Sequence, residues 1–181
     1  METIGFLELN SIAKGIEAAD AMLKAAEVRL ITARPSCPGK YHVLVTGEVA
    51  AVQSSVEAGM ETASANVLDQ VVIPRVHPQV IAAIGLSTVP EQSNAVGILE
   101  YFSVTASLYG ADAAVKAADV TLLEVRLGTG IGGKSFVVMT GNVSAVTEGV
   151  EAGAASAGDS GLLVSRVVIP SPHPELFESL Y

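Results

Sequence analysis

Apolar residues recur at helical spacing in two separate parts of the chain. In the first part they are Ile12, Ile16, Ala19, Leu23 and Ala26. In the second part they are Val104, Leu108, Ala111, Val115 and Ala118. Side chains three or four residues apart lie on one face of a helix. The pattern predicts two amphipathic helices, each of which packs this face against a sheet.

Short runs of branched residues flank these helices. The runs "VRLITAR" at 28–34 and "YHVLVTG" at 41–47 are separated by a turn, as in a hairpin. A second helix follows with Val49, Val52 and Val56 inward, and "VVIP" at 71–74 ends the sheet, because proline cannot donate to a strand ladder. The resulting order, β-α-β-β-α-β, predicts an α+β, ferredoxin-like domain.

The chain carries this pattern twice. The segment "IGFLELNSIAKGIEAADAMLKAAEVRL" at 4–30 aligns with "VGILEYFSVTASLYGADAAVKAADVTL" at 96–122, and "VVIPRVHP" at 71–78 aligns with "VVIPSPHP" at 167–174. Such self-similarity indicates a duplicated domain. We predict two tandem, unpermuted domains at 3–86 and 95–181, with residues 79–94, which contain "STVPEQSN", linking the two sheets.

Composition excludes several classes of partner. The chain has 181 residues, a formal net charge of -9 and only ten Lys and Arg residues, which argues against binding nucleic acid. No apolar run approaches the roughly 18 residues needed to span a bilayer, and the first ten residues, "METIGFLELN", carry an acidic residue where a signal peptide would be basic. We expect a cytoplasmic protein without a membrane segment.

The only cysteine, Cys37, lies in the stretch "RPSCPGKY". A free cysteine is most often a small residue of the core. Here the neighbours Pro35, Ser36, Pro38 and Gly39 are turn residues, so the segment is expected on a surface or beside an opening. A single cysteine also excludes an internal disulfide, which fits a reducing compartment.

The equivalent turn of the second repeat, "GTGIGGK", is rich in glycine and contains no cysteine. Gly130, Gly132 and Gly133 allow free backbone angles, and an ordinary hairpin loop needs nothing more. The G-x-x-x-x-G-K-[ST] spacing of a phosphate loop is absent. We therefore do not expect a nucleotide site.

No catalytic arrangement is visible. His42, His77 and His173 do not cluster in the sequence, and the repeated "HP" after the last strand suggests that His77 and His173 begin a helix rather than bind metal. Glu8 and Glu100 are equivalent through duplication, which needs no catalytic explanation. No Ser-His-Asp or Cys-His arrangement can be argued from the spacing. We do not expect an enzyme.

The segments "ADAMLKAAEV", "GEVAAVQSSVEAG" and "VIPRVHP" together resemble the bacterial microcompartment shell domain, and the match covers nearly the whole chain twice. Two unpermuted copies, with a cysteine in "CPGK", are most similar to the tandem shell proteins of propanediol-utilisation compartments. The resemblance implies a structural protein of a cytoplasmic microcompartment shell. It also implies a homotrimer, with six domains around a pseudo-sixfold axis, that tiles with other shell proteins.

The resemblance further implies that six turns line a central pore. The residues concerned are Ser36, Cys37, Pro38, Gly39, Lys40, Gly130, Ile131, Gly132, Gly133 and Lys134. Three Cys37 thiolates, one per chain, would hold one [4Fe-4S] cluster per trimer, because soft thiolates suit iron-sulfur clusters. The fourth iron would need water or another ligand. The cluster would serve electron transfer across the shell, for which an enclosed redox enzyme is a candidate partner.

The resemblance also places Lys24 and Lys116 at the rim of the trimer, with Arg75 nearby and Ser171 in place of the arginine in the second copy. Lysines on the solvated side of a helix are the simpler interpretation. Two other functions stay open: a plain shell tile with a metabolite pore and an incidental thiol, or a small ferredoxin-like enzyme or ligand sensor with a site between the domains.

Overall fold

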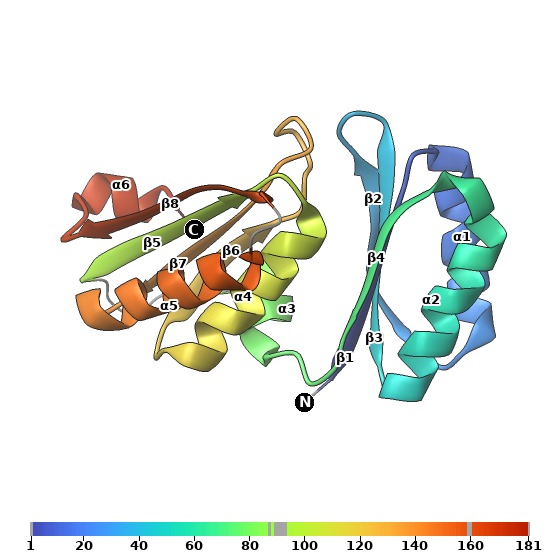
Figure 1. The fold of residues 1–181 in the computed structure, drawn as a ribbon, viewed down its shortest axis with the longest axis horizontal. Coiled ribbons are helices and arrows are strands. Elements are labelled where there is room, and N and C mark those ends of the chain that lie inside the picture. Colours follow the sequence, from blue (N-terminus) through green and yellow to red (C-terminus); the bar gives the residue numbers. More distant parts are fainter. Residues whose placement is uncertain (1, 87, 89–93, 159–160, 181) are drawn as a thin grey trace. The chain divides into compact units, whose positions relative to one another are not determined.

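The computed structural model describes residues 2–86, 88, 94–158 and 161–180. The chain divides into two compact units, Met1–Val76 and His77–Tyr181, called unit 1 and unit 2 below. Each unit holds one four-stranded antiparallel sheet (Figure 1). Of the predicted linker, residues 87 and 89–93 lie outside the described residues.

Unit 1 has the predicted order of elements. They are β1 (Thr3–Leu9), α1 (Ile12–Ala25), β2 (Arg29–Ser36), β3 (Lys40–Gly47), α2 (Val49–Ala63), the 3-10 turn η1 (Ser64–Asn66) and β4 (Val67–Ile73). The strands lie in the order β2-β3-β1-β4, and both helices cover one face of the sheet (Figure 1). The ferredoxin-like fold is therefore confirmed for this unit.

The core of unit 1 lies between this sheet and its two helices. Its buried members are Leu7, Leu9, Ala18, Ala19, Met22, Tyr41, Val43, Val45, Val52, Val56 and Ala63. At Gly5 an added Cβ would lie 2.7 Å from Val52 Cγ1, so glycine lets α2 approach the centre of the sheet closely. Burial of these apolar side chains is the main stabilising term of the unit.

Unit 2 repeats the fold and adds a helix at each end. Its elements are α3 (Pro78–Ile84), β5 (Ala95–Tyr101), α4 (Val104–Ala117), β6 (Thr121–Arg126), β7 (Ser135–Gly141), α5 (Val143–Ser156), β8 (Leu163–Pro170) and α6 (Pro174–Glu178). The strand order β6-β7-β5-β8 matches that of unit 1. Phe177 and Leu180 pack against a small cluster of Val96, Leu123 and Val138. Val96 and Val138 lie on the sheet face opposite α4 and α5, because the face that α5 covers carries Gly97.

The face that α1 buries differs from the predicted one. Ile12, Ile16 and Leu23 are 41%, 56% and 39% exposed, whereas the buried side consists of Gly15, Ala18, Ala19 and Met22. Small residues occupy the buried face because the helix lies very close to β3. A Cβ added to Gly15 would lie 2.4 Å from Tyr41 Cβ. The prediction is right for Ala19 and wrong for the three large residues.

In α4 the predicted apolar stripe is buried, but the helix also buries a second face, which is the one that packs on the sheet. Val104, Leu108 and Val115 are 2%, 0% and 8% exposed, and the helix also buries Ser107, Gly110, Ala111 and Ala114, the equivalents of the sheet-facing residues of α1. In α2, Val52 and Val56 are buried as predicted, and Val49 is 41% exposed. Both first helices thus carry two apolar faces, of which α1 leaves one uncovered.

Helix α3 packs in unit 2, against β6 and α4, although the first domain was predicted to run to residue 86. His77 N donates to Asp112 Oδ1 at 2.8 Å, which ties the start of α3 to α4. His77 and His173 cap α3 and α6, since Nδ1 of each accepts from the backbone N of Gln79 and Glu175, respectively. The prediction that both histidines begin a helix is confirmed.

Candidate pore turns

The turn between β2 and β3 is closed by a backbone hydrogen bond. Gly39 N donates to Ser36 O at 3.0 Å, and Gly39 has a φ of +82°, a left-handed conformation that glycine adopts without strain. Cys37 lies in this turn as a half-buried free thiol, and Pro38 and Gly39 are exposed. The thiol therefore lies at the tip of the hairpin and is partly open to solvent.

Ser36 does not have the exposed position predicted for it. The residue is 6% exposed, and its Oγ has no hydrogen-bond partner among the residues that the structure describes. A buried hydroxyl without a partner costs on the order of 1–3 kcal/mol, and such groups in native proteins usually meet water, an ion or another partner. Ser36 is thus an unused hydrogen-bond donor directly beside Cys37.

Lys40, at the end of the turn, is held by a buried carboxylate. Lys40 Nζ donates to Glu8 Oε1 at 3.1 Å, and His42 Nε2 lies 2.9 Å from the same oxygen. Burial by itself would raise the pKa of Glu8. The hydrogen bonds with His42 and Lys40 and the charge of Lys40 outweigh burial and hold this pKa below its ordinary value of 4.5. Glu8 is therefore a carboxylate that fixes the lysine beside the turn.

The turn of unit 2 keeps the lysine and has no thiol. Lys134 Nζ donates to Glu100 Oε1 at 2.8 Å, which repeats the pairing of unit 1. The backbone φ angles are +78°, +68° and +82° for Gly130, Gly132 and Gly133. A Cβ on Gly130 or Gly132 would meet no atom within 4 Å. The left-handed backbone, rather than crowding, therefore explains these glycines.

One chain does not assemble a metal site within the described residues. No three His, Cys, Asp or Glu side chains converge there, and Cys37 is the only cysteine of the whole sequence. An iron-sulfur cluster takes several thiolates, so a site at Cys37 requires thiolates from further copies of the chain. The thiol at the hairpin tip can ligate iron, and the unpartnered hydroxyl of Ser36 can donate a hydrogen bond. Both groups therefore suit such a cluster chemically.

The predicted edge residues lie on the surface of their units. Lys24 Nζ is 2.6 Å from Asp20 Oδ2, and the lysine side chain is 75% exposed. Lys116 repeats this pair with Asp112 at 2.5 Å. The exposed Arg75 has a φ of +52°. The equivalent residue of unit 2, Ser171, is also exposed and has a φ of +49°. The two repeats therefore share the backbone conformation at this position and differ in the side chain it presents.

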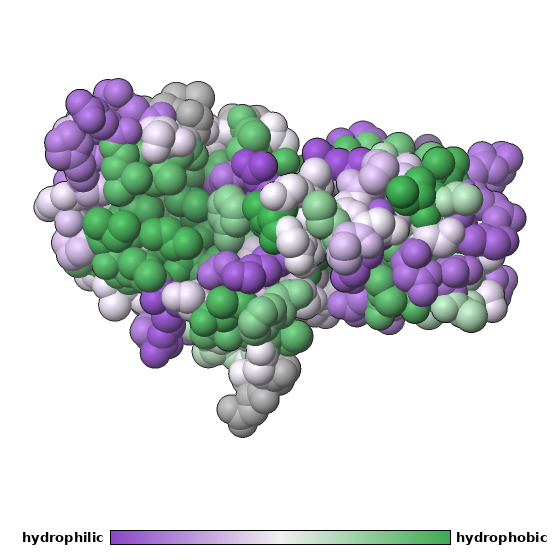
Figure 2. Space-filling view, turned by 90° about the horizontal axis from the view of Figure 1, so that it is seen from above, coloured by the Kyte–Doolittle hydropathy of each residue, from purple (hydrophilic) through white to green (hydrophobic). Residues whose placement is uncertain are grey.

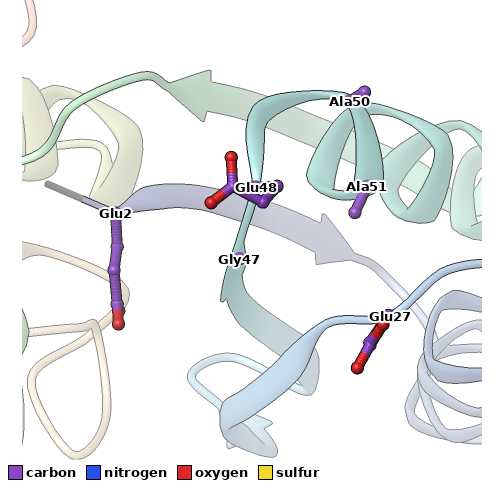
Figure 3. Close-up of a pocket in the computed structure, with 6 residues that line it drawn as sticks. All are labelled: Glu2, Glu27, Gly47, Glu48, Ala50 and Ala51. Carbon is purple, nitrogen blue, oxygen red and sulfur yellow. The ribbon is translucent and has the colours of Figure 1, made fainter.

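Sequence patterns did not indicate an acidic hollow on unit 1, shown in Figure 3. The cavity, of about 660 Å³, is lined by Glu2, Glu27, Gly47, Glu48, Ala50 and Ala51. Its carboxylates come from three separate parts of the chain, so no local motif reveals them. Glu2 Oε2 already accepts from Thr46 Oγ1 at 2.9 Å and from Arg29 Nη2 at 3.3 Å.

The repeat does not preserve two of the acids that line this hollow. At the positions equivalent to Glu2 and Glu48, unit 2 has Asn94 and Asn142, and Asn94 Nδ2 donates to Asn142 Oδ1 at 3.1 Å. Two amides that are hydrogen-bonded to each other therefore replace two of the acids. Two of the three acids that line the hollow are therefore particular to unit 1, and its lining includes no residue of the hairpin that carries Cys37.

Two segments of the chain, residues 3–76 and 95–172, match the model of the BMC domain. The chain belongs to the BMC domain family. One match lies in each unit, so the predicted fold class of two tandem BMC domains is confirmed. Below, the first and second BMC domains are the two matched segments.

Three similar proteins extend this assignment over both BMC domains. The chain is 46% identical to the bacterial microcompartment shell protein PduT of Citrobacter freundii, over 99% of this chain and 97% of the relative. It is 30% identical to the carboxysome assembly protein CcmO of Synechococcus elongatus, over 98% of this chain and 68% of the relative. A crystal structure of a microcompartment protein from Desulfitobacterium hafniense DCB matches with a TM-score of 0.95 and 55% identity, over 98% and 99% of the two chains.

These matches confirm the resemblance to microcompartment shell proteins and the expectation of a structural, non-enzymatic protein. Among the described residues, no helix combines the length and the apolar character that crossing a bilayer requires.

Proposed function

We propose that this BMC protein is a trimeric shell tile whose central pore holds one [4Fe-4S] cluster through Cys37 of each chain. The observation that carries the proposal is the placement of the only thiol at the tip of a hairpin, beside the buried and unpartnered hydroxyl of Ser36. The relative PduT is a shell protein, which supports the same role for this chain.

Two exposed apolar surfaces support an assembly in which one face of a chain contacts a different face of the next chain. One such surface is the outer face of α1, with Ile12, Ile16 and Leu23 exposed where Val104, Leu108 and Val115 are buried. The other lies on the sheet of unit 2, where Val167 is 44% exposed and its equivalent Val71 only 4%. Monomers seldom leave contiguous apolar areas open.

Figure 2 shows hydrophobic side chains gathered on unit 2. A hollow of about 320 Å³ on the uncovered sheet face is lined by Ile98, Glu100, Phe136, Val138 and Leu180. Each uncovered face has a buried equivalent in the other repeat, so we infer that they cover each other between chains. A contact between two different faces is heterologous, and it closes into a ring when the rotation permits. In the pseudo-sixfold ring that the family resemblance implies, two pseudo-equivalent domains per chain give three chains.

Closing the ring brings three Cys37 thiols to one axis. Thiolates are soft ligands that suit iron-sulfur clusters, and three of them leave the fourth iron to water or another ligand. When bound, the cluster supplies one-electron redox chemistry. The residues of the chain position it: the Gly39 turn presents the thiol, Glu8 holds the Lys40 ammonium beside the turn, and Ser36 offers a hydrogen bond.

A redox centre in a pore connects the two sides of the shell. We infer that it passes electrons between the lumen and the cytoplasm, with other shell proteins as lateral partners and an enclosed redox enzyme as the electron donor or acceptor. The glycine-rich turns of the second BMC domain, with Ile131 between glycines, contribute the remaining pore lining.

Native mass spectrometry of protein purified without oxygen tests this proposal. The expected result is a trimer whose mass includes one [4Fe-4S] cluster, together with the brown colour of iron-sulfur protein. A trimer without iron would instead make the protein a plain shell tile with a metabolite pore and an incidental thiol. A monomer that binds a small ligand saturably would contradict both.

A further inference from the structure

The outer edge of the sheet in unit 2 is closed by one side chain. Gln79 of α3 donates from Nε2 to Val120 O at 3.3 Å, and its Oε1 accepts from Leu122 N at 2.8 Å. Strand β6 is the edge strand, and unpaired backbone groups on an edge are a template for further pairing. The side-chain amide of Gln79 therefore hydrogen-bonds to the backbone of this edge as a neighbouring strand would.

The edge of unit 1 has the same backbone geometry and no such cap. Strand β2 is its edge strand. Leu30 lies opposite Val45 as Leu122 lies opposite Met139, and the pairing register shifts directly after both leucines. Leu30 N therefore points outward as Leu122 N does. No side chain of the described residues is hydrogen-bonded to Val28 O or Leu30 N.

The apolar side chains around this edge are exposed to solvent as well. Leu30 is 40% exposed, whereas Leu122 is fully buried. The outer face of α1 beside it is uncovered at Ile12, Ile16 and Leu23, whose equivalents on α4 are buried. In unit 2 the helix α3 lies against both β6 and α4. Unit 1 therefore lacks, at this edge, the helix that α3 provides in unit 2.

The repeat identifies that helix as α6. It follows the last strand of the second BMC domain, as α3 follows the last strand of the first, and both begin at a capping histidine. Glu175 occupies the position of Gln79, and Leu176 that of Val80. Val80 is fully buried, but Leu176 is 44% exposed. An uncovered leucine on α6 matches an uncovered edge on unit 1.

We propose that α6 of one chain docks on β2 and α1 of a second copy, with Glu175 at the edge of β2 and Leu176 against the apolar face. In the chain, the helix after the first domain docks on the next domain. The uncovered edge of β2 on unit 1 is a site of the same kind, so the domain on which α6 docks is the first domain of another copy. This inference rests on the proposed trimer and names the contact that closes it.

The replacement of Gln79 by Glu175 gives this contact a distinct chemistry. A carboxylate accepts hydrogen bonds and donates none when ionised. Glu175 can therefore accept from Leu30 N, but it cannot donate to Val28 O as the Gln79 amide donates to Val120 O. Glu175→Gln should restore the second hydrogen bond. Since a net hydrogen bond changes an equilibrium by roughly three- to tenfold, this variant should tighten each junction between chains by that factor.

A mixing experiment with charged substitutions tests the docking directly. Leu176→Asp and Leu30→Asp each damage one side of the junction, so each variant alone should be monomeric by native mass spectrometry and folded by circular dichroism. Mixed in equal amounts, they should form a heterodimer and no closed trimer, because one intact α6 meets one intact β2 edge. Val143→Asp is the matched control, since Val143 and its equivalent Val49 are exposed alike, at 42% and 41%.

The outcomes separate this inference from the proposed assembly. If the parent chain is trimeric and Leu176→Asp stays trimeric, α6 does not make the contact, although the trimer stands. If both variants are folded monomers whose mixture remains monomeric, the two residues do not face each other and the docking is wrong. If the parent itself is monomeric at shell-forming concentrations, the proposed trimer fails first.

Discussion

Lys40 Nζ lies 3.1 Å from Glu8 Oε1, and the equivalent atoms of Lys134 and Glu100 lie 2.8 Å apart. Both lysines end a hairpin turn, and each carboxylate comes from an inner strand of its sheet, β1 or β5. The first pair is the more buried, with the lysine and carboxylate side chains 27% and 11% exposed. The second pair is 44% and 34% exposed. The two repeats therefore anchor their turns in the same way but at different depths.

The difference in depth predicts unequal effects of removing the charges. Glu8→Gln leaves the Lys40 ammonium without its carboxylate and disturbs the hydrogen bond to His42, so it should lower the free energy of unfolding by about 1.5–3 kcal/mol. Glu100→Gln, in the more exposed pair, should cost less than about 1 kcal/mol. Urea denaturation of both variants measures the two values. Equal losses would show that burial does not set the strength of these pairs.

The lowered pKa of Glu8 predicts that its contribution to the free energy of unfolding is lost at acidic pH. A carboxyl whose pKa is lower in the folded than in the unfolded state stabilises the fold fully above its unfolded value of about 4.5. This stabilisation is lost as the pH falls from there through the folded pKa. The difference in unfolding free energy between the parent and Glu8→Gln should therefore be constant near neutral pH and shrink below about pH 4.5. A difference that grows on acidification would contradict the assigned direction.

The unpartnered hydroxyl of Ser36 predicts an effect on the reduction potential of the proposed cluster. Hydrogen bonds to cluster sulfurs influence the potential, and a donor stabilises the more negative, reduced state. Ser36→Ala should therefore lower the midpoint potential without changing the iron content per trimer, and Ser36→Thr should restore it. Thr129→Ala, in the exposed turn without cysteine, is the control. Identical potentials for parent and Ser36→Ala, measured by anaerobic spectroelectrochemistry, would show that this hydroxyl does not reach the cluster.

The exposed lysines Lys24 and Lys116 predict separate effects on folding and on tiling. Exposed ion pairs contribute little to stability, so Lys24→Ala should keep the melting temperature of the parent. Lys116 pairs with the buried Asp112, so the double variant Lys24→Ala, Lys116→Ala should melt at a lower temperature but keep the trimer mass. If the lysines contact neighbouring tiles, the variant should no longer form extended sheets in electron micrographs. Lys14→Ala, which removes another exposed lysine of α1 paired with Glu17, should form sheets normally. Unchanged sheets in the double variant would make these lysines ordinary solvated residues.

The sequence predicted the elements and the repeat more reliably than the buried faces. The order of the elements along the chain and the two histidine caps follow from local patterns, because short-range spacing and turn chemistry determine them. The face of α1 does not follow, since periodicity selects the large residues Ile12, Ile16 and Leu23. The structure buries Gly15 instead, where close packing on Tyr41 excludes a side chain. A single sequence does not distinguish an apolar face that packs within a chain from one left for a partner.

The site was predictable in position and only partly in detail. The turn residues around Cys37 indicate a hairpin tip, because proline and glycine have strong turn preferences. The contacts among Glu8, Lys40 and His42 join residues 32 and 34 positions apart, and they depend on the register between β1 and β3. The burial of Ser36 likewise depends on tertiary packing. No spacing rule in the sequence contains that information.

The central claim is that three Cys37 thiolates hold one cluster, and the Cys37→Ser variant tests it most directly. Parent and variant are reconstituted with iron and sulfide without oxygen, and iron, sulfide and the electron paramagnetic resonance spectrum of the reduced protein are measured on isolated trimers. We expect one [4Fe-4S] cluster per trimer in the parent, and none in a variant that stays folded and trimeric. A Cys37→Ser trimer that binds as much iron and sulfide as the parent would contradict the account.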